Sequence, residues 1–166
     1  MTNHVHIVIQ VGKINLSTII QNLAFRYTRH INKKLKRVGH LFQGRFRSVL
    51  VDSNRYLKEL IRYVHLNPVR KSMVSRPEDY HWSSHKFYLN LDRLTWLTSD
   101  HVLKNFGNNR SIAINNFHNF VLAGIGVEEK LDFETGLNEG ILGDDDFIEI
   151  VRTKCEGEDW DTAEVE

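Results

Sequence analysis

The sequence predicts an α+β domain, because segments with the two-residue period of a strand alternate with segments with the three-to-four-residue period of a helix. Residues 4–11 alternate as a strand does, and residues 16–35 carry one continuous apolar helical face. Residues 40–51 are rich in aromatic and β-branched side chains and indicate a strand or strand pair. Residues 55–65 indicate a second helix.

The helix predicted over residues 16–35 is the most basic stretch of the chain. Asn15 or Ser17 is suited to cap its start, and Gly39 is suited to end it. Its apolar face consists of Leu16, Ile20, Leu23, Tyr27, Ile31 and Leu35. The basic side chains around it are Arg26, Arg29, Lys33, Lys34, Lys36 and Arg37.

The helix predicted over residues 55–65 can be capped by Asp52 or Ser53. Pro68 is expected to end it, because proline disfavours helical geometry in the residue before it. Shorter helical patterns follow from residue 82 and at residues 99–106 and 111–122, and the acidic tail contains one amphipathic patch at residues 145–151.

Charge is distributed unevenly along the chain, although its formal net charge is only +1. Residues 1–126 hold 19 Lys and Arg against 6 Asp and Glu, a net charge of +13, whereas residues 127–166 hold 3 against 15, a net charge of −12. A basic body followed by an acidic tail favours a nucleic-acid-binding protein over one whose charge serves solubility alone.

The composition also bears on the cellular compartment. Cys155 is the single cysteine, so no disulfide can form within the chain, and a reducing cytoplasm is expected. The N-terminal residues do not resemble a secretory signal, and no run of about 18 apolar residues suggests a membrane span. Hydrophobic residues make up 41% of the chain, which is typical of a globular protein.

His4 and His6 are the first candidates for chemistry. Residues two apart on a strand point to the same side, so both imidazoles could bind one cation. Taken alone, such a pair is more often an ordinary surface feature than a metal site. The pair therefore needs a second element before it predicts function.

The helix over residues 55–65 supplies that element. Tyr56, Tyr63 and Asn67 follow one helical stripe, together with Leu60. If the stripe faces the histidines, Asn67 could complete a metal site and Tyr63 could attack a phosphate, since phosphodiester cleavage uses a nucleophile and a divalent ion. The alternative is that both tyrosines are core residues of an amphipathic helix.

Four ordered motifs resemble the REP-associated tyrosine transposases, relatives of the insertion-sequence transposases that carry one catalytic tyrosine and a His-hydrophobic-His (HUH) motif. The resemblance is strong over residues 1–90 and looser at residues 106–120 and 141–147. Its motifs are Asn3-His-Val-His-Ile-Val-Ile9, Gly39-His-Leu-Phe-Gln-Gly-Arg-Phe46, Arg62-Tyr-Val-His-Leu-Asn-Pro-Val-Arg70 and Tyr80-His-Trp-Ser-Ser84.

This resemblance implies a ferredoxin-like HUH nuclease domain over residues 1–90, incomplete at its N-terminus. The helical patterns that follow indicate a helical extension over 91–126, and the acidic composition of residues 127–166 indicates a tail that is expected to be disordered. It implies Mg²⁺ or Mn²⁺ held by His4, His6 and Asn67. Tyr63 would attack single-stranded DNA at the foot of a hairpin, giving a 5′-phosphotyrosine and a free 3′-OH. Tyr56 is the competing tyrosine.

The remaining conspicuous residues are interpreted as DNA contacts or as scaffold. Phe42, Phe46 and Trp82 could stack on bases, with core packing expected for at least two of them. His40 and His65 could lie in the active site or make structural hydrogen bonds. Residues expected to contact DNA are Arg26, Arg29, Lys33, Lys34, Arg45, Arg47, Arg62 and Arg70.

Two other functions remain open at this point. One is an HUH relaxase or replication initiator, against which the motif at residues 62–68 argues. The other is a catalytically dead remnant that binds hairpin DNA, a reading that an N-terminal truncation would favour. The sequence also allows a homodimer.

Overall fold

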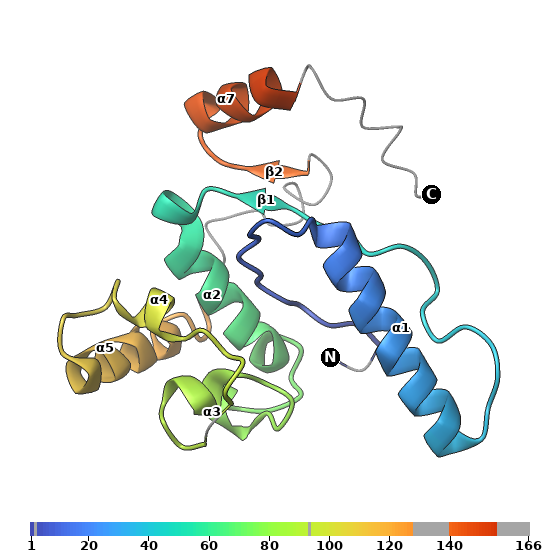
Figure 1. The fold of residues 1–166 in the computed structure, drawn as a ribbon. Coiled ribbons are helices and arrows are strands. Elements are labelled where there is room, and N and C mark those ends of the chain that lie inside the picture. The colour runs from blue at the N-terminus through green and yellow to red at the C-terminus, as the bar shows by residue number, and fades with distance from the viewer. Residues whose placement is uncertain (2, 93, 128–139, 156–166) are drawn as a thin grey trace. The chain divides into compact units, whose positions relative to one another are not determined.

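A computed structural model describes residues 1, 3–92, 94–127 and 140–155. The chain divides into two compact units, of which unit 1 comprises Met1–Ile7 and Val49–Glu166, and unit 2 comprises Val8–Ser48. The elements are mostly helices with one small sheet (Figure 1), so the predicted α+β class is confirmed. Within the described ranges, no helix is long and apolar enough to cross a membrane.

Unit 2 consists of helix α1 (Leu16–Leu35) and the irregular chain around it. Of the two candidate caps, Asn15 is the one used, because its Oδ1 accepts a hydrogen bond from the backbone N–H of Thr18 at 2.9 Å. The helix ends before Gly39, since Lys36 takes a left-handed conformation with φ of 50°. The side-chain amide of Asn32 then donates to the backbone oxygen of Gly39 at 2.9 Å and closes the turn.

The strand predicted over residues 4–11 is wrong, because this segment is irregular in the structure. The pattern at residues 40–51 yields only the two-residue strand β1 (Leu50–Val51). An alternating pattern reports which side chains can share a face, but a strand also needs a neighbour for its backbone hydrogen bonds. No described segment pairs with residues 4–11 in this way.

The sheet of unit 1 joins two segments that are far apart in the sequence. Strand β1 runs parallel to β2 (Ile141–Leu142), with Leu50 opposite Ile141 and Val51 opposite Leu142. The N–H of Asp52 extends the pairing by donating to the oxygen of Leu142 at 2.9 Å. The region expected to be a disordered tail therefore supplies β2 and helix α7 (Asp145–Cys155), while its residues 128–139 and 156–166 lie outside the described part.

Helix α2 (Ser53–Arg70) is the helix that carries both candidate tyrosines, and it continues past Pro68. The prediction that Pro68 ends the helix is wrong. A proline this close to the C-terminal end removes a single backbone donor, and its side chain is buried. The following N–H groups are satisfied nearby, because Lys71 donates to Asn67 at 3.0 Å and Met73 donates to Pro68 at 2.9 Å.

The core of unit 1 forms where α2 meets helix α5 (Arg110–Leu122) and two short helices, α3 (His85–Tyr88) and α4 (Asp100–Leu103). These three helices lie within or next to the predicted segments. Phe117 is fully buried at its centre, stacked on Tyr88 with ring centroids 5.0 Å apart. The buried apolar residues are Ile61, Leu66, Tyr88, Val102, Leu103, Ala113, Phe117 and Val121.

Candidate active site and a histidine cluster

His4 and His6 lie together in unit 1 although their segment is not a strand. Their ring centroids are 5.0 Å apart and the rings are nearly perpendicular. His4 Nδ1 donates to the side-chain oxygen of Asn3 at 2.8 Å, which leaves the lone pair of this ring on Nε2. His6 is half-buried, and burial, followed by the neighbouring His4, lowers its pKa. Neutral imidazole is the form that binds metal ions.

Tyr63 of α2 reaches this pair. Its ring lies edge-on to His6, with centroids 5.6 Å apart and an angle of 86° between the ring planes. The guanidinium carbon of Arg70 lies 5.8 Å from the centre of the Tyr63 ring, two helical turns along α2. The structure thus brings together one predicted ligand, the predicted nucleophile and one predicted phosphate contact.

Asn67 lies one turn after Tyr63 on α2 and is buried, with 6% of its surface exposed. Its Nδ2 has no hydrogen-bond partner in the described residues. The unpaired atom is a hydrogen-bond donor, which an acceptor rather than a cation would satisfy, so metal ligation by Asn67 would have to go through its Oδ1.

The predicted DNA-contacting residues are divided between the two units. Arg62 in unit 1 is half-buried and forms an ion pair with Glu59. Its guanidinium carbon lies 4.4 Å from the centre of the Phe120 ring. On α1 in unit 2, Arg26, Arg29 and Lys33 line one surface hollow together with Asn22, Phe25 and His30. Lys34 belongs to the last turn of the same helix, and Arg45 and Arg47 follow in the irregular chain of unit 2.

Three aromatic side chains are more exposed than the sequence suggested. Core packing was expected for at least two of Phe42, Phe46 and Trp82, but their exposed fractions are 48%, 41% and 82%. The ring of Phe42 lies 6.2 Å from that of Tyr27 on α1, measured between ring centroids. Aromatic content alone does not separate a core position from a surface position, which explains the error.

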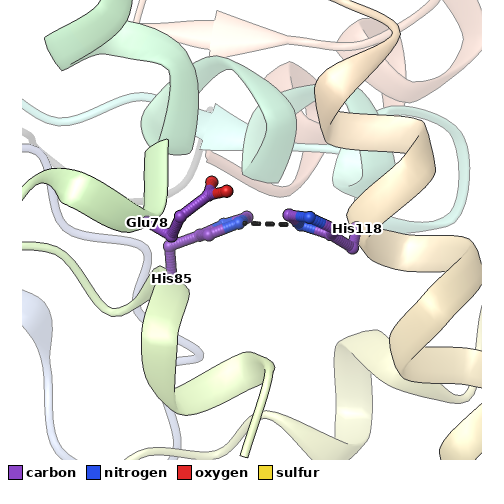
Figure 2. A group of neighbouring side chains, drawn as sticks. All are labelled: Glu78, His85 and His118. Atoms are coloured by element: carbon purple, nitrogen blue, oxygen red, sulfur yellow. Dashed lines mark hydrogen bonds between the residues drawn. The ribbon is translucent and has the colours of Figure 1, made fainter. Parts of the chain in front are cut away.

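A second group of histidines lies in the core of unit 1. His65 of α2 and His85 of α3 are both buried, and their Nδ1 atoms are 2.9 Å apart in a hydrogen bond. His85 Nε2 is 3.3 Å from Nδ1 of His118 on α5, and Glu78 of the 3-10 helix η1 (Pro77–Asp79) lies beside them. Figure 2 shows the rings of His85 and His118 turned toward each other. His65 is therefore structural, one of its two predicted roles.

The protonation of these groups follows from their burial. Burial, followed by the neighbouring His85, lowers the pKa of His65 to about 3. Burial, followed by His118, lowers the pKa of His85 to about 4. Burial acts to raise the pKa of Glu78, but hydrogen bonds from its own backbone and from Arg76 outweigh it, and the pKa falls below its ordinary value. At neutral pH His65 and His85 are thus neutral and Glu78 is a carboxylate.

The group of Glu78, His85 and His118 was not predicted from the sequence. Each of the three residues offers a ligand atom within 4.8 Å of the other two, so they could hold a metal ion. They are separated by 7 and 33 positions along the chain, which matches no local ligand spacing. The available signal was the presence of a histidine in two of the predicted helical patterns, those from residue 82 and at residues 111–122.

Comparison with known proteins agrees with the N-terminal motifs. Residues 1–67 match the family described as "Transposase IS200 like", and the matched segment includes His4, His6, Tyr63 and Asn67. No curated protein and no solved structure matches the chain. Residues 1–67, which are less than half of the chain, are therefore similar in sequence to the IS200-like transposases.

Proposed function

We propose that this protein is a transposase that cuts and rejoins single-stranded DNA at hairpin-associated sites, with Tyr63 as its nucleophile. The observation that carries the proposal is the edge-on contact of His6 with Tyr63, 5.6 Å between ring centroids. The two residues are far apart in the sequence, and both belong to the matched family segment. A histidine pair beside a tyrosine ring is suited to metal-assisted attack on a phosphate.

The donor set suits a divalent ion. Two imidazoles and the amide oxygen of Asn67 would bind Mg²⁺ or Mn²⁺ and leave positions open for phosphate oxygens. The hydrogen bond that His4 Nδ1 donates to Asn3 leaves the lone pair of the ring on Nε2, where a cation can bind. When bound, the ion would polarise the scissile phosphate and stabilise the charge that develops on it.

Tyr63 would carry out the covalent step. Its hydroxyl oxygen attacks the phosphorus and the bond to the 3′ oxygen breaks, so the DNA strand is left with a 3′-OH that takes up the proton. The 5′ end is then joined to Tyr63 through a phosphotyrosine. The reverse reaction with another 3′-OH rejoins DNA without an external energy source. Arg70 beside the Tyr63 ring would place a positive charge near the phosphate.

The basic residues would hold the DNA backbone. Arg26, Arg29, Lys33 and Lys34 follow α1, and residues 1–50 contain no acidic side chain to oppose them. We place the catalytic part in residues 1–90, as part of a ferredoxin-like HUH domain, with residues 91–126 as a helical extension and 127–166 as an acidic tail. Arg45, Arg47 and Arg62 would add further phosphate contacts.

A covalent-adduct assay tests the proposal. The protein is incubated with end-labelled hairpin DNA that has single-stranded flanks, in the presence of Mn²⁺, and adducts are separated on a denaturing gel. Tyr63→Phe should abolish the adduct, because the hydroxyl is the nucleophile. Tyr56→Phe is the matched control on the same helix and should retain it.

Each other outcome has a definite meaning. An adduct that persists in Tyr63→Phe and disappears in Tyr56→Phe would overturn the choice of nucleophile. A wild-type protein that binds the hairpin but never forms an adduct would overturn catalysis and leave a hairpin-binding protein. If Mn²⁺ is omitted and a chelator is added, the wild-type protein should form no adduct, although its Tyr63 is intact.

A further inference from the structure

Glu78, His85 and His118 lie beyond the segment that matches the transposase family, and the proposed reaction does not use them. They come from three separate elements, η1, α3 and α5, so their meeting depends on the tertiary structure. His85 has no exposed surface, whereas Glu78 and His118 are half-buried and connect the site to solvent.

The two imidazoles are already spaced as metal ligands. A tetrahedral Zn²⁺ ion binds histidine nitrogens at about 2.0–2.1 Å, which places two such nitrogens about 3.3 Å apart. Nε2 of His85 and Nδ1 of His118 are 3.3 Å apart. A carboxylate oxygen of Glu78 lies within 4.8 Å of both and would need a small side-chain movement to complete the third bond.

The partners of His85 can fix the tautomer that a ligand requires. If His85 Nδ1 donates to His65 Nδ1, the other nitrogen of His65 carries its proton and donates to Ser84 Oγ, 3.3 Å away. In that arrangement Nε2 of His85 keeps its lone pair and accepts a hydrogen bond from Nδ1 of His118, so metal binding requires the proton of His118 to move to its Nε2. A hydrogen bond to the second ring nitrogen is the usual support of a histidine ligand.

Glu78 supplies an oxygen that lacks a protein partner. Its Oε1 accepts a hydrogen bond from Arg76. Its Oε2 is buried and has no partner in the part of the chain that the structure describes. A buried carboxylate oxygen without a donor is unfavourable, and a cation removes that penalty.

We propose that Glu78, His85 and His118 bind a Zn²⁺ ion, with a water molecule in the fourth position, at a site separate from Tyr63. Two imidazoles and one carboxylate favour Zn²⁺ over the oxygen-preferring Mg²⁺. The ion fastens α5 and α3 to η1. His65 acts as a positioning residue through its bond to His85, and because it lies on α2 two residues after Tyr63, the site steadies the helix that carries the nucleophile.

Metal titration of the full chain tests this site. Protein stripped with a chelator is titrated with Zn²⁺ alone by calorimetry, and with Co²⁺, whose visible absorption reports tetrahedral coordination. Glu78→Gln keeps the shape of the side chain and removes its charge, and His118→Ala removes a half-buried ring. Each substitution should weaken Zn²⁺ binding by about 10- to 100-fold. Circular dichroism establishes that each variant is folded.

Two controls separate this site from the proposed catalytic one. The double variant His4→Ala/His6→Ala should keep the tetrahedral Co²⁺ spectrum, and His101→Ala, an exposed histidine on α4, should bind Zn²⁺ as the wild type does. Wild-type affinity in both Glu78→Gln and His118→Ala would overturn the proposal. So would loss of the spectrum in the His4/His6 variant, or a wild-type chain that binds no Zn²⁺.

Discussion

Two groups of histidines in unit 1 differ in their burial and in the contacts that hold them in place. His4 is exposed and His6 half-buried, and both lie on irregular chain that meets α2 through the ring of Tyr63. His65 and His85 are 2% and 0% exposed, and each contacts the other as well as the ring of Phe117. The first group can be reached by a macromolecule such as DNA, whereas the second belongs to the hydrophobic core.

The difference in burial corresponds to two roles of histidine, one in an open site for DNA and one in a buried cluster. A site for DNA must leave ligand positions open and therefore gains little stability from its own packing. A buried cluster must satisfy every polar atom internally, so it ties neighbouring elements together. We therefore expect substitutions in the first group to reduce activity with little loss of stability, and substitutions around the second group to do the reverse.

The largest expected effect is on stability, from Phe117→Ala. The ring contacts both buried histidines and Tyr88, and its removal leaves a cavity among them. The free energy of unfolding should fall by about 3–5 kcal/mol, as measured by urea denaturation followed by circular dichroism. A loss below about 1 kcal/mol would show that the cluster is not part of a close-packed core.

The second effect is on activity, from His6→Ala. Removing a ligand should reduce adduct formation by at least about 100-fold, since loss of supporting partners alone costs about 10- to 100-fold. The urea midpoint should stay near the wild-type value, because His6 is only half-buried. His81→Ala, in the loop before α3, is a matched histidine control that should retain activity. A large loss of stability in His6→Ala would remove the distinction between the two groups.

Local patterns explain which elements the sequence could predict. Helix α1 has its predicted bounds because its apolar spacing and the Asn15 cap act within one stretch of chain. Strand β1 could not be paired in advance, because its partner β2 lies about 90 positions later in a region whose composition resembles a tail. The predicted strand over residues 4–11 failed for the related reason that its pattern contained no information about a pairing partner.

The same reasoning applies to the candidate sites. Tyr63 and Asn67 are one helical turn apart, so their neighbourhood follows from spacing alone. The prediction that His6 lies near Tyr63 also required the family motifs, because nothing in either segment specifies the contact. The cluster around His85 had no such motif, and only the packing of α3 and α5 on α2 brings its members together.

A smaller effect is expected at the start of α5, which carries both Phe117 and His118. The side chain of Asn109 accepts hydrogen bonds from the N–H groups of Ser111 at 2.9 Å and Ile112 at 3.2 Å. Asn109→Ala should lower the free energy of unfolding by about 1 kcal/mol, whereas Asn109→Asp retains the acceptor and should cost less. Adduct formation at a temperature well below the unfolding midpoint should not change, since the cap lies far along the chain from Tyr63.

The smallest effect is expected from an ion pair that belongs to neither histidine group. Arg55 at the start of α2 pairs with Asp144, which precedes α7, and the Arg55 side chain is 60% exposed. Arg55→Ala should cost about 0.2–1 kcal/mol, and the difference from wild type should shrink in about 1 M salt, where exposed charges are screened. Asp144→Ala should cost more, because Asp144 Oδ1 also accepts a hydrogen bond from the N–H of Phe147 at 2.9 Å. Asp144→Asn retains that acceptor without the charge, so its loss of stability should equal that of Arg55→Ala. Equal losses in Asp144→Asn and Asp144→Ala would show instead that the charge, rather than the cap, connects α2 to α7.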